Sequence, residues 1–164
     1  MSPSPAPDWQ IEHWLNTPKP IGLADLSGKV VLALAFQMLC PGCVSHALPQ
    51  AVRARQTFAE ADVAVIGLHT VFEHLEAQGS PAALGAFLHE YRIGFPVGID
   101  AKDPAAGLPK TMQAYGMQGT PTTLLFDREG RLRLNKFGHF DDMRLGAAIA
   151  SLLAETVPAA ATPD

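Results

Sequence analysis

The chain contains two cysteines, and they lie three positions apart in the segment Cys40-Pro41-Gly42-Cys43. A continuous apolar run of strand length, residues 30–36, comes just before them. After them, apolar residues recur at the spacing of one helix face. A Cys-x-x-Cys pair at the junction of a buried strand and a helix, beside a strand–helix–strand pattern, indicates a dithiol redox site.

The start of the predicted helix gives the two sulfurs different roles. Pro41 suits the first helical position, because an N–H group there would have no partner within the helix. Cys40 is then the N-cap residue, and its sulfur faces the free backbone N–H groups of Gly42 and Cys43 and the positive end of the helix dipole. Both effects favour thiolate, the nucleophile in disulfide exchange. We therefore expect Cys40 to attack a partner disulfide and Cys43 to resolve the mixed disulfide.

Other uses of the cysteine pair fit its surroundings less well. A structural disulfide would add roughly 2 kcal/mol for so short a loop in the chain-entropy model. Two inert buried cysteines would not explain the Pro-Gly between them. A zinc or copper carrier would use Cys40, Cys43 and a histidine such as His46; zinc normally needs four ligands, whereas copper(I) favours a soft sulfur pair. Metal transport is therefore the alternative from another class, whereas the dithiol reaction requires no cofactor.

Composition and charge narrow the class of protein further. Of the 164 residues, 48% are hydrophobic and 17% are charged, which is typical of one globular domain. The net charge of −4 gives no broad basic surface for nucleic acid. No apolar run approaches the length of a membrane span. Residues 1–10 lack the basic and apolar regions of a signal peptide, so we expect a cytoplasmic location.

The residue pattern predicts a single α/β domain over residues 9–155, between a disordered stretch at 1–8 and a loose tail at 156–164. Trp9 and Trp14 belong to a segment that is expected only to dock on this domain. The predicted strands are 29–36, 63–68, 95–99, 122–126 and 132–137, the last two joined by a hairpin turn. The first two should be parallel, because a helix connects them.

The predicted helices have recognisable start signals. The first runs from about Cys40 to Glu60, and Pro49 should bend it. After a polar loop over residues 69–79, Ser80-Pro81 supplies an N-cap and a first-turn proline for the next helix. The predicted buried side of that helix contains Leu84, Phe87, Leu88 and Tyr91. A short helix over 108–115 and a final helix capped by Asp141 complete the pattern.

Three segments carry a resemblance to a known family: Leu-Ser-Gly-Lys-Val-Val-Leu at 26–32, the Cys-Pro-Gly-Cys segment, and Gly-Thr-Pro-Thr-Thr-Leu-Leu-Phe-Asp-Arg-Glu-Gly at 119–130. Together with the element order they resemble the thioredoxin-fold thiol-disulfide oxidoreductases of the cytochrome-c-maturation type and the related redoxins, over about Trp14 to Leu153. The resemblance implies a thioredoxin-like fold: a central mixed sheet, helices on both faces, and an extra helix and strand inserted before the proline-led strand. It also implies protein or small-molecule disulfides or dithiols as partners.

By this resemblance, Thr120-Pro121 is the family's cis-proline pair, which lies beside the active cysteines. A proline at the start of a strand removes one N–H group and leaves the local backbone unpaired. The main chain of Thr120 is then free to pair with an incoming peptide. One departure from the family pattern lies next to the nucleophile, where Leu39 replaces the usual tryptophan.

Further departures concern the resolving cysteine. Thioredoxin itself has a buried aspartate six residues before its first cysteine, where this chain has Leu34. Some family members supply a glutamate from the loop after the second strand, so Glu73 or Glu76 is the candidate proton acceptor for Cys43. The simpler interpretation is that both are solvated loop charges. The helix proline, Pro49, follows Cys43 by six residues instead of the family's five, so the local helix register should differ.

Several histidines fall near the predicted site. His69 follows the second predicted strand, and with Glu73 and His74 it would suit a proton relay or a weak metal site. The favoured interpretation is a polar loop above the active face. His46, one turn beyond Cys43, is interpreted as a residue of the helix surface.

A peroxidatic cysteine site is the less favoured enzymatic alternative. Such sites have a threonine three residues before the attacking cysteine and a proline seven residues before it. Cys40 is preceded at these positions by Gln37 and Ala33, and Cys43 by Cys40 and Phe36. Neither cysteine therefore has the surroundings that this chemistry uses.

Overall fold

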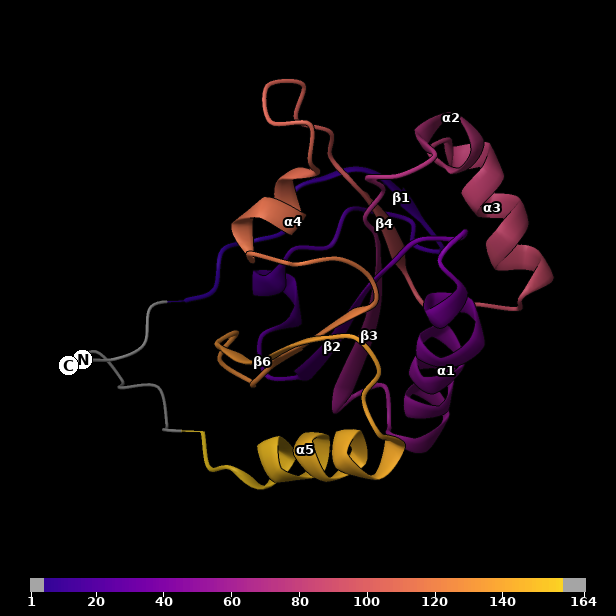
Figure 1. The fold of residues 1–164 in the computed structure, drawn as a ribbon. Coiled ribbons are helices and arrows are strands. Elements are labelled where there is room, and N and C mark those ends of the chain that lie inside the picture. Colours follow the sequence, from indigo (N-terminus) through magenta and orange to yellow (C-terminus); the bar gives the residue numbers. More distant parts are fainter. Residues whose placement is uncertain (1–4, 158–164) are drawn as a thin grey trace.

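The computed structural model describes residues 5–157. Residues 1–4 and 158–164, on which parts of the predicted disordered stretch and loose tail fall, lie outside the described residues. Within 5–157, six strands form one mixed sheet in the order β1-β4-β3-β2-β5-β6 (Figure 1). The strands are β1 (Ile11–Leu15), β2 (Val30–Phe36), β3 (Val63–His69), β4 (Val97–Asp100), β5 (Thr122–Phe126) and β6 (Leu132–Phe137). This is the thioredoxin-like fold.

Among the described residues, five α-helices accompany the sheet. They are α1 (Leu48–Thr57), α2 (Leu75–Gln78), α3 (Pro81–Glu90), α4 (Lys110–Ala114) and α5 (Asp142–Ala154). Apolar residues of α1, α3 and α5 pack on one face, while those of α4, of a 3-10 helix (Leu23–Leu26) and Trp9 pack on the other. Figure 1 shows α1 and α4 on opposite sides of the sheet. Helix α3 and strand β4, which lie between β3 and β5 in the chain, form the insert implied by the family resemblance.

Strand β2 lies at the centre of the sheet and is buried at every residue. It pairs in parallel with β3, as the strand–helix–strand pattern predicts, and in antiparallel with β5. Because successive side chains of a strand point to opposite faces, this one strand contributes to both apolar cores. Its continuous apolar sequence is what such a position requires.

The N-terminal segment forms a strand, where the sequence predicts only a docking segment. β1 pairs in antiparallel with β4 at the edge of the sheet. Just before it, the Asp8 carboxylate accepts hydrogen bonds from the backbone N–H groups of Trp9 and Leu23, both at 3.0 Å. Trp9 itself is buried and packs edge-on against Phe126. Side-chain and backbone contacts therefore fix this segment on the domain.

The helix after the cysteines is shorter and less regular than predicted. It is helical from Pro41, passes through a π-helical turn (Cys43–Ala47), and ends at Thr57 instead of Glu60. In the π-turn the N–H of Leu48 bonds to the carbonyl of Cys43 five residues back. Pro49 follows Cys43 by one residue more than in the family pattern, and the wider π-helical turn accommodates this residue. The predicted change in helix register is therefore a π-turn.

The loop after β3 also differs from the prediction, because it contains the short helix α2. Helix α3 begins as predicted: the Ser80 side chain accepts a backbone hydrogen bond from the first turn. Leu84 and Leu88 are buried, but Tyr91 is 54% exposed and was wrongly predicted to face the core. Its ring stacks instead on the half-buried Phe87 at a centroid distance of 4.4 Å.

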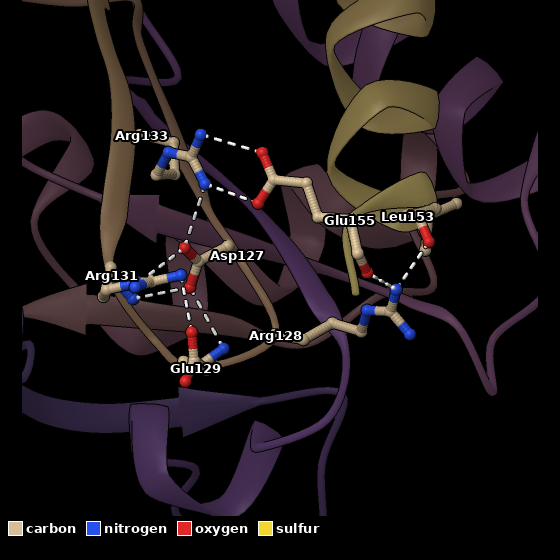
Figure 2. Close-up of polar contacts among 7 residues, drawn as sticks. All are labelled: Asp127, Arg128, Glu129, Arg131, Arg133, Leu153 and Glu155. Carbon is tan, nitrogen blue, oxygen red and sulfur yellow. Dashed lines mark hydrogen bonds and ion pairs between the residues drawn. The ribbon is translucent and has the colours of Figure 1, made fainter. Parts of the chain in front are cut away.

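Charged side chains attach the end of α5 to the β5–β6 hairpin (Figure 2). Arg128 in the hairpin turn donates to the carbonyls of Leu153 and Glu155, both at 2.5 Å. Arg133 on β6 forms a two-point pair with the Glu155 carboxylate at 2.7 and 2.8 Å, and also donates to Asp127 at 3.1 Å. The two Arg128 contacts satisfy carbonyls at the C-terminal end of the helix, where carbonyls lack partners within the helix, and the Arg133 contacts join side chains only.

Candidate active site

Cys40 lies at the start of the helix that follows β2, with its side chain half-buried, and Cys43 is fully buried. The Cys40 carbonyl accepts the N–H of Val44 at 3.1 Å, and the Cys40 sulfur accepts the N–H of Cys43 at 3.3 Å. This is the N-cap arrangement that the sequence predicts. Of the two amides expected to face the sulfur, only that of Cys43 makes a hydrogen bond to it among the described residues. Both thiols are free.

The environment of Cys43 favours its protonated form. Burial, followed by the hydrogen bond with the Cys40 side chain, raises the pKa of the Cys43 thiol to about 12. At neutral pH Cys43 is therefore a thiol. Its sulfur is therefore inaccessible and protonated, whereas the side chain of Cys40 is half-buried.

The structure brings the Thr120–Pro121 turn next to the cysteines. The peptide bond between these residues is cis, as the resemblance implies. The Thr120 carbonyl accepts a hydrogen bond from Cys40 Sγ at 3.6 Å. Gly42 faces Pro121 so closely that a Cβ atom added there would lie 3.8 Å from Pro121 Cδ. Two segments eighty residues apart in the chain thus form the two walls of one site.

The glutamates suggested as proton acceptors are not joined to the cysteines. Glu73 and Glu76 are both exposed, and within residues 5–157 neither carboxylate makes a hydrogen bond to Cys40 or Cys43. Their role as proton acceptors stays a prediction. Leu39, which replaces the family's tryptophan, is 55% exposed beside Cys40 and gives this side of the site an apolar surface.

Metal binding at the cysteine pair finds little support in the arrangement of the described residues. Among them, no group of three or more His, Cys, Asp or Glu side chains is gathered where a metal ion could bind. His46, the third ligand considered for a carrier, instead bonds to Ser45 Oγ at 2.7 Å and packs edge-on against His139. A metal carrier is therefore not the favoured function.

His69 is not a residue of a polar loop, as the sequence suggests, but the last residue of β3, with 0% exposure. Its Nε2 accepts the N–H of Met38 at 3.3 Å, so this nitrogen is unprotonated, while Nδ1 has no hydrogen-bond partner within residues 5–157. Burial lowers the pKa of His69 to about 4. The imidazole is therefore neutral at physiological pH and supports the chain just before the cysteines.

Two buried glutamines complete the site, and the sequence reasoning did not identify them as functional. The sequence marks Gln37 only as a mismatch to the peroxidatic threonine, and it assigns no role to Gln78. Gln37 donates to Thr120 Oγ1 at 3.1 Å, and Gln78 accepts the N–H of Leu39 at 3.0 Å. The available signal was the position of Gln37, a polar residue directly after an all-apolar central strand. Nothing in the sequence around Gln78 indicates its burial.

Comparison with known proteins gives consistent results. A family model described as the AhpC/TSA family matches residues 3–135. The chain is 33% identical to the protein DipZ of Mycobacterium bovis over 162 residues, which cover 97% of this chain but only 22% of DipZ. The chain thus spans about a fifth of the length of this curated relative.

Two solved structures are similar over almost their whole length. One is a thioredoxin-like superfamily protein with 54% identity and a TM-score of 0.90, covering 94% of this chain and 99% of that one. The other is described as a thiol-disulfide isomerase from Corynebacterium glutamicum, with 44% identity and a TM-score of 0.88, covering 93% and 97% of the two chains. In residues 5–157, no helix combines the length and the apolar character needed to cross a membrane.

Proposed function

Because the chain belongs to the AhpC/TSA family, we propose that it is a thiol-disulfide oxidoreductase in which Cys40 is the nucleophile and Cys43 the resolving thiol. The observation that carries the proposal is the convergence of two backbone groups on the Cys40 sulfur. The N–H of Cys43 donates to it at 3.3 Å, and the carbonyl of Thr120 lies 3.6 Å from it. The similarity to a protein described as a thiol-disulfide isomerase supports the same reaction class.

The reaction transfers two electrons in two exchange steps. The Cys40 thiolate attacks one sulfur of the partner disulfide, so that a mixed disulfide forms and the other partner sulfur leaves as a thiolate. Cys43 then releases its proton to solvent, and the thiolate so formed attacks Cys40 Sγ. The second partner sulfur leaves, the Cys40–Cys43 disulfide forms, and the partner is reduced. The reverse sequence oxidises a partner dithiol, and both directions use the same residues.

The raised pKa of Cys43 fits this order of events. Two of the contributions that raise the pKa come from Cys40: its side-chain hydrogen bond and its charge. Both disappear once the Cys40 sulfur is bound to a partner in the mixed disulfide. Cys43 therefore becomes easier to deprotonate at the step in which it must attack, although burial continues to oppose its ionisation.

The partners are proteins or small molecules that contain a disulfide or a dithiol. Thr120 and Pro121 position an extended partner segment beside Cys40, with the Thr120 main chain as the pairing edge. A cytoplasmic location, expected from the N-terminal composition, remains part of the proposal, and cell fractionation with an antibody against the chain tests it.

The test is to trap the mixed disulfide. A Cys43→Ser variant incubated with insulin, whose disulfides are exposed, should form a covalent adduct that dithiothreitol releases and that mass spectrometry locates at Cys40. The matched Cys40→Ser variant should form none, because its remaining thiol is buried and protonated. If Cys43→Ser forms no adduct and Cys40 reacts with iodoacetamide no faster than free glutathione at pH 7, the proposed function is wrong.

A further inference from the structure

Two buried glutamines connect the segment before the cysteines with the Thr120–Pro121 turn. Gln37 directly follows β2 and Gln78 is the last residue of α2, and each is 1% exposed. Burying an amide costs free energy unless its hydrogen bonds are replaced. Both side chains make several hydrogen bonds, and these bonds lead to the two walls of the site.

The orientation of the Gln37 amide follows from its surroundings. Its Oε1 accepts three hydrogen bonds, from the backbone N–H groups of Phe72 (3.2 Å) and Glu73 (3.3 Å) and from Gln78 Nε2 (3.1 Å). Because all three neighbours are donors, the oxygen must be on this side of the amide and the nitrogen on the other. Gln37 Nε2 accordingly donates to Thr120 Oγ1 at 3.1 Å.

Gln78 extends the same network to the cysteine segment. Its Oε1 accepts the N–H of Leu39, the residue before Cys40, at 3.0 Å. Its Nε2 donates to Gln37 and also to the carbonyl of Glu73 at 2.7 Å. The two amides therefore link Leu39 on one side of the site to Thr120 on the other through an unbroken series of hydrogen bonds.

We propose that Gln37 and Gln78 are positioning residues that hold Thr120 beside the Cys40 sulfur, ready to pair with an extended partner segment. This role rests on the proposed function. The hydroxyl of Thr120 is fixed by Gln37, while the carbonyl of the same residue lies 3.6 Å from Cys40 Sγ. Without the amide contact, Thr120 loses a restraint on its orientation, and the pairing edge is no longer organised before the partner arrives.

This role predicts a difference between partners of different size. A protein disulfide needs the Thr120 edge, because its main chain must be held while its sulfur aligns with Cys40. Iodoacetamide needs only access to the sulfur. Loss of the Gln37–Thr120 contact should therefore slow the reaction with insulin and leave the alkylation of Cys40 by iodoacetamide nearly unchanged.

The experiment measures both rate constants for reduced wild-type protein and for three variants: Gln37→Met, Thr120→Val and the double variant. Each single substitution should lower the insulin rate constant by about tenfold, equivalent to about 1.4 kcal/mol, and change the iodoacetamide rate constant by less than twofold. The double variant should be no slower than either single variant, because both changes remove one shared contact. Thr120→Ser, which keeps the hydroxyl, should retain the wild-type insulin rate.

The matched control is Gln50→Met. Gln50 is another buried glutamine, at 6% exposure; its Nε2 donates to Asp142 Oδ1 at 2.9 Å, and among residues 5–157 it makes no hydrogen bond to Gln37, Gln78 or Thr120. It should lose stability without losing the insulin reaction. The inference is wrong if Gln50→Met slows the insulin reaction as much as Gln37→Met, or if the Gln37 and Thr120 effects are additive. It is also wrong if Thr120→Val, which tests the contact even where Gln37→Met does not fold, reduces insulin at the wild-type rate.

Failure of the two proposals can be told apart. A wild-type protein that does not reduce insulin overturns the proposed function and the positioning role together. A wild-type protein that reduces insulin, together with Gln37→Met and Thr120→Val variants that reduce it at the wild-type rate, overturns the positioning role alone.

Discussion

The two cysteines differ in solvent exposure, although only two residues separate them in the chain. Cys40 is half-buried, whereas Cys43 has 0% exposure and a pKa raised from 9.0 to about 12, first by burial. The folded state therefore holds the Cys43 proton over a pH range in which the unfolded chain releases it. Between about pH 9 and 12 the folded state binds more protons than the unfolded state, so the free energy of unfolding falls as pH rises.

This pH dependence can be isolated with a Cys43→Ala variant. Under reducing conditions, the urea midpoint of the wild type should fall more steeply between pH 8 and pH 10.5 than that of the variant, which has no thiol to titrate at this position. Urea unfolding followed by circular dichroism at both pH values provides the comparison. Equal slopes for the two proteins would contradict the assigned thiol environment.

His69 makes the opposite contribution, on the acid side. Its pKa is lowered from 6.5 to about 4 by burial, so below pH 6.5 the unfolded chain takes up a proton that the folded state does not. Stability due to this residue is complete above pH 6.5 and is lost as pH falls toward 4. We expect the loss at pH 4.5 to be on the order of 2–3 kcal/mol. His69→Gln should flatten the stability profile between pH 4.5 and 7 in urea titrations.

The control for this prediction is His89→Gln, which removes a histidine from an exposed position of α3. If His69→Gln and His89→Gln give the same acid profile, the buried imidazole is not the cause of the acid sensitivity.

At the scale of elements, two arginines attach α5 to the β5–β6 hairpin, and they do so through different kinds of contact (Figure 2). Arg128 binds two backbone carbonyls at the helix end and its Nε is buried, whereas Arg133 pairs with Glu155 at side-chain exposures of 39% and 40%. Arg133 also donates to the buried Asp127, but Arg131 Nε binds the same carboxylate oxygen at 2.8 Å, so Asp127 keeps a charged partner when Arg133 is replaced. Exposed ion pairs stabilise by about 0–1 kcal/mol, and hydrogen bonds from a charged group by about 1.5–3 kcal/mol. Arg128→Met should therefore destabilise more than Arg133→Met in urea unfolding, and the reverse order would contradict this assignment.

Elements defined by local sequence could be predicted, and those defined by distant partners could not. Strand β2 follows from its apolar run, and the starts of α3 and α5 follow from Ser80 and Asp141, whose side chains cap their helices. β1 was missed because its partner, β4, lies about eighty residues away, and no local pattern specifies that pairing. The π-turn was foreseen only as an additional residue before Pro49, without its geometry.

The same distinction holds within the site. The cysteine pair and the Thr120–Pro121 turn have recognisable sequence motifs, whereas Gln37 and Gln78 act through a tertiary network that forms only when the loop after β3 folds over the end of β2. Solvent exposure of Tyr91 likewise depends on where α3 ends relative to the sheet, which helical spacing alone does not determine.

At the scale of the whole molecule, the two apolar cores share one sheet, and β2 contributes side chains to both. Trp9 reports on the core beside α4, and Cys43 reports on the core beside α1 and α5. Because neither core can lose β2 without exposing the other, we expect the two cores to unfold in one transition. Separate unfolding would require β2 to remain in place with one face uncovered.

This prediction can be tested with two probes on one protein. In a Cys40→Ser variant, two signals are followed during urea titration: the fluorescence of Trp9 and Trp14, and the labelling of Cys43 by dithiobis(nitrobenzoate). The two signals should give the same midpoint. The labelling reagent should react only as the core opens, because the Cys43 thiol is buried and protonated in the folded state. Labelling well below the fluorescence midpoint would show that the α1 side opens on its own. The second half of the exchange reaction would then depend on local opening around Cys43 and not only on the geometry of the folded site.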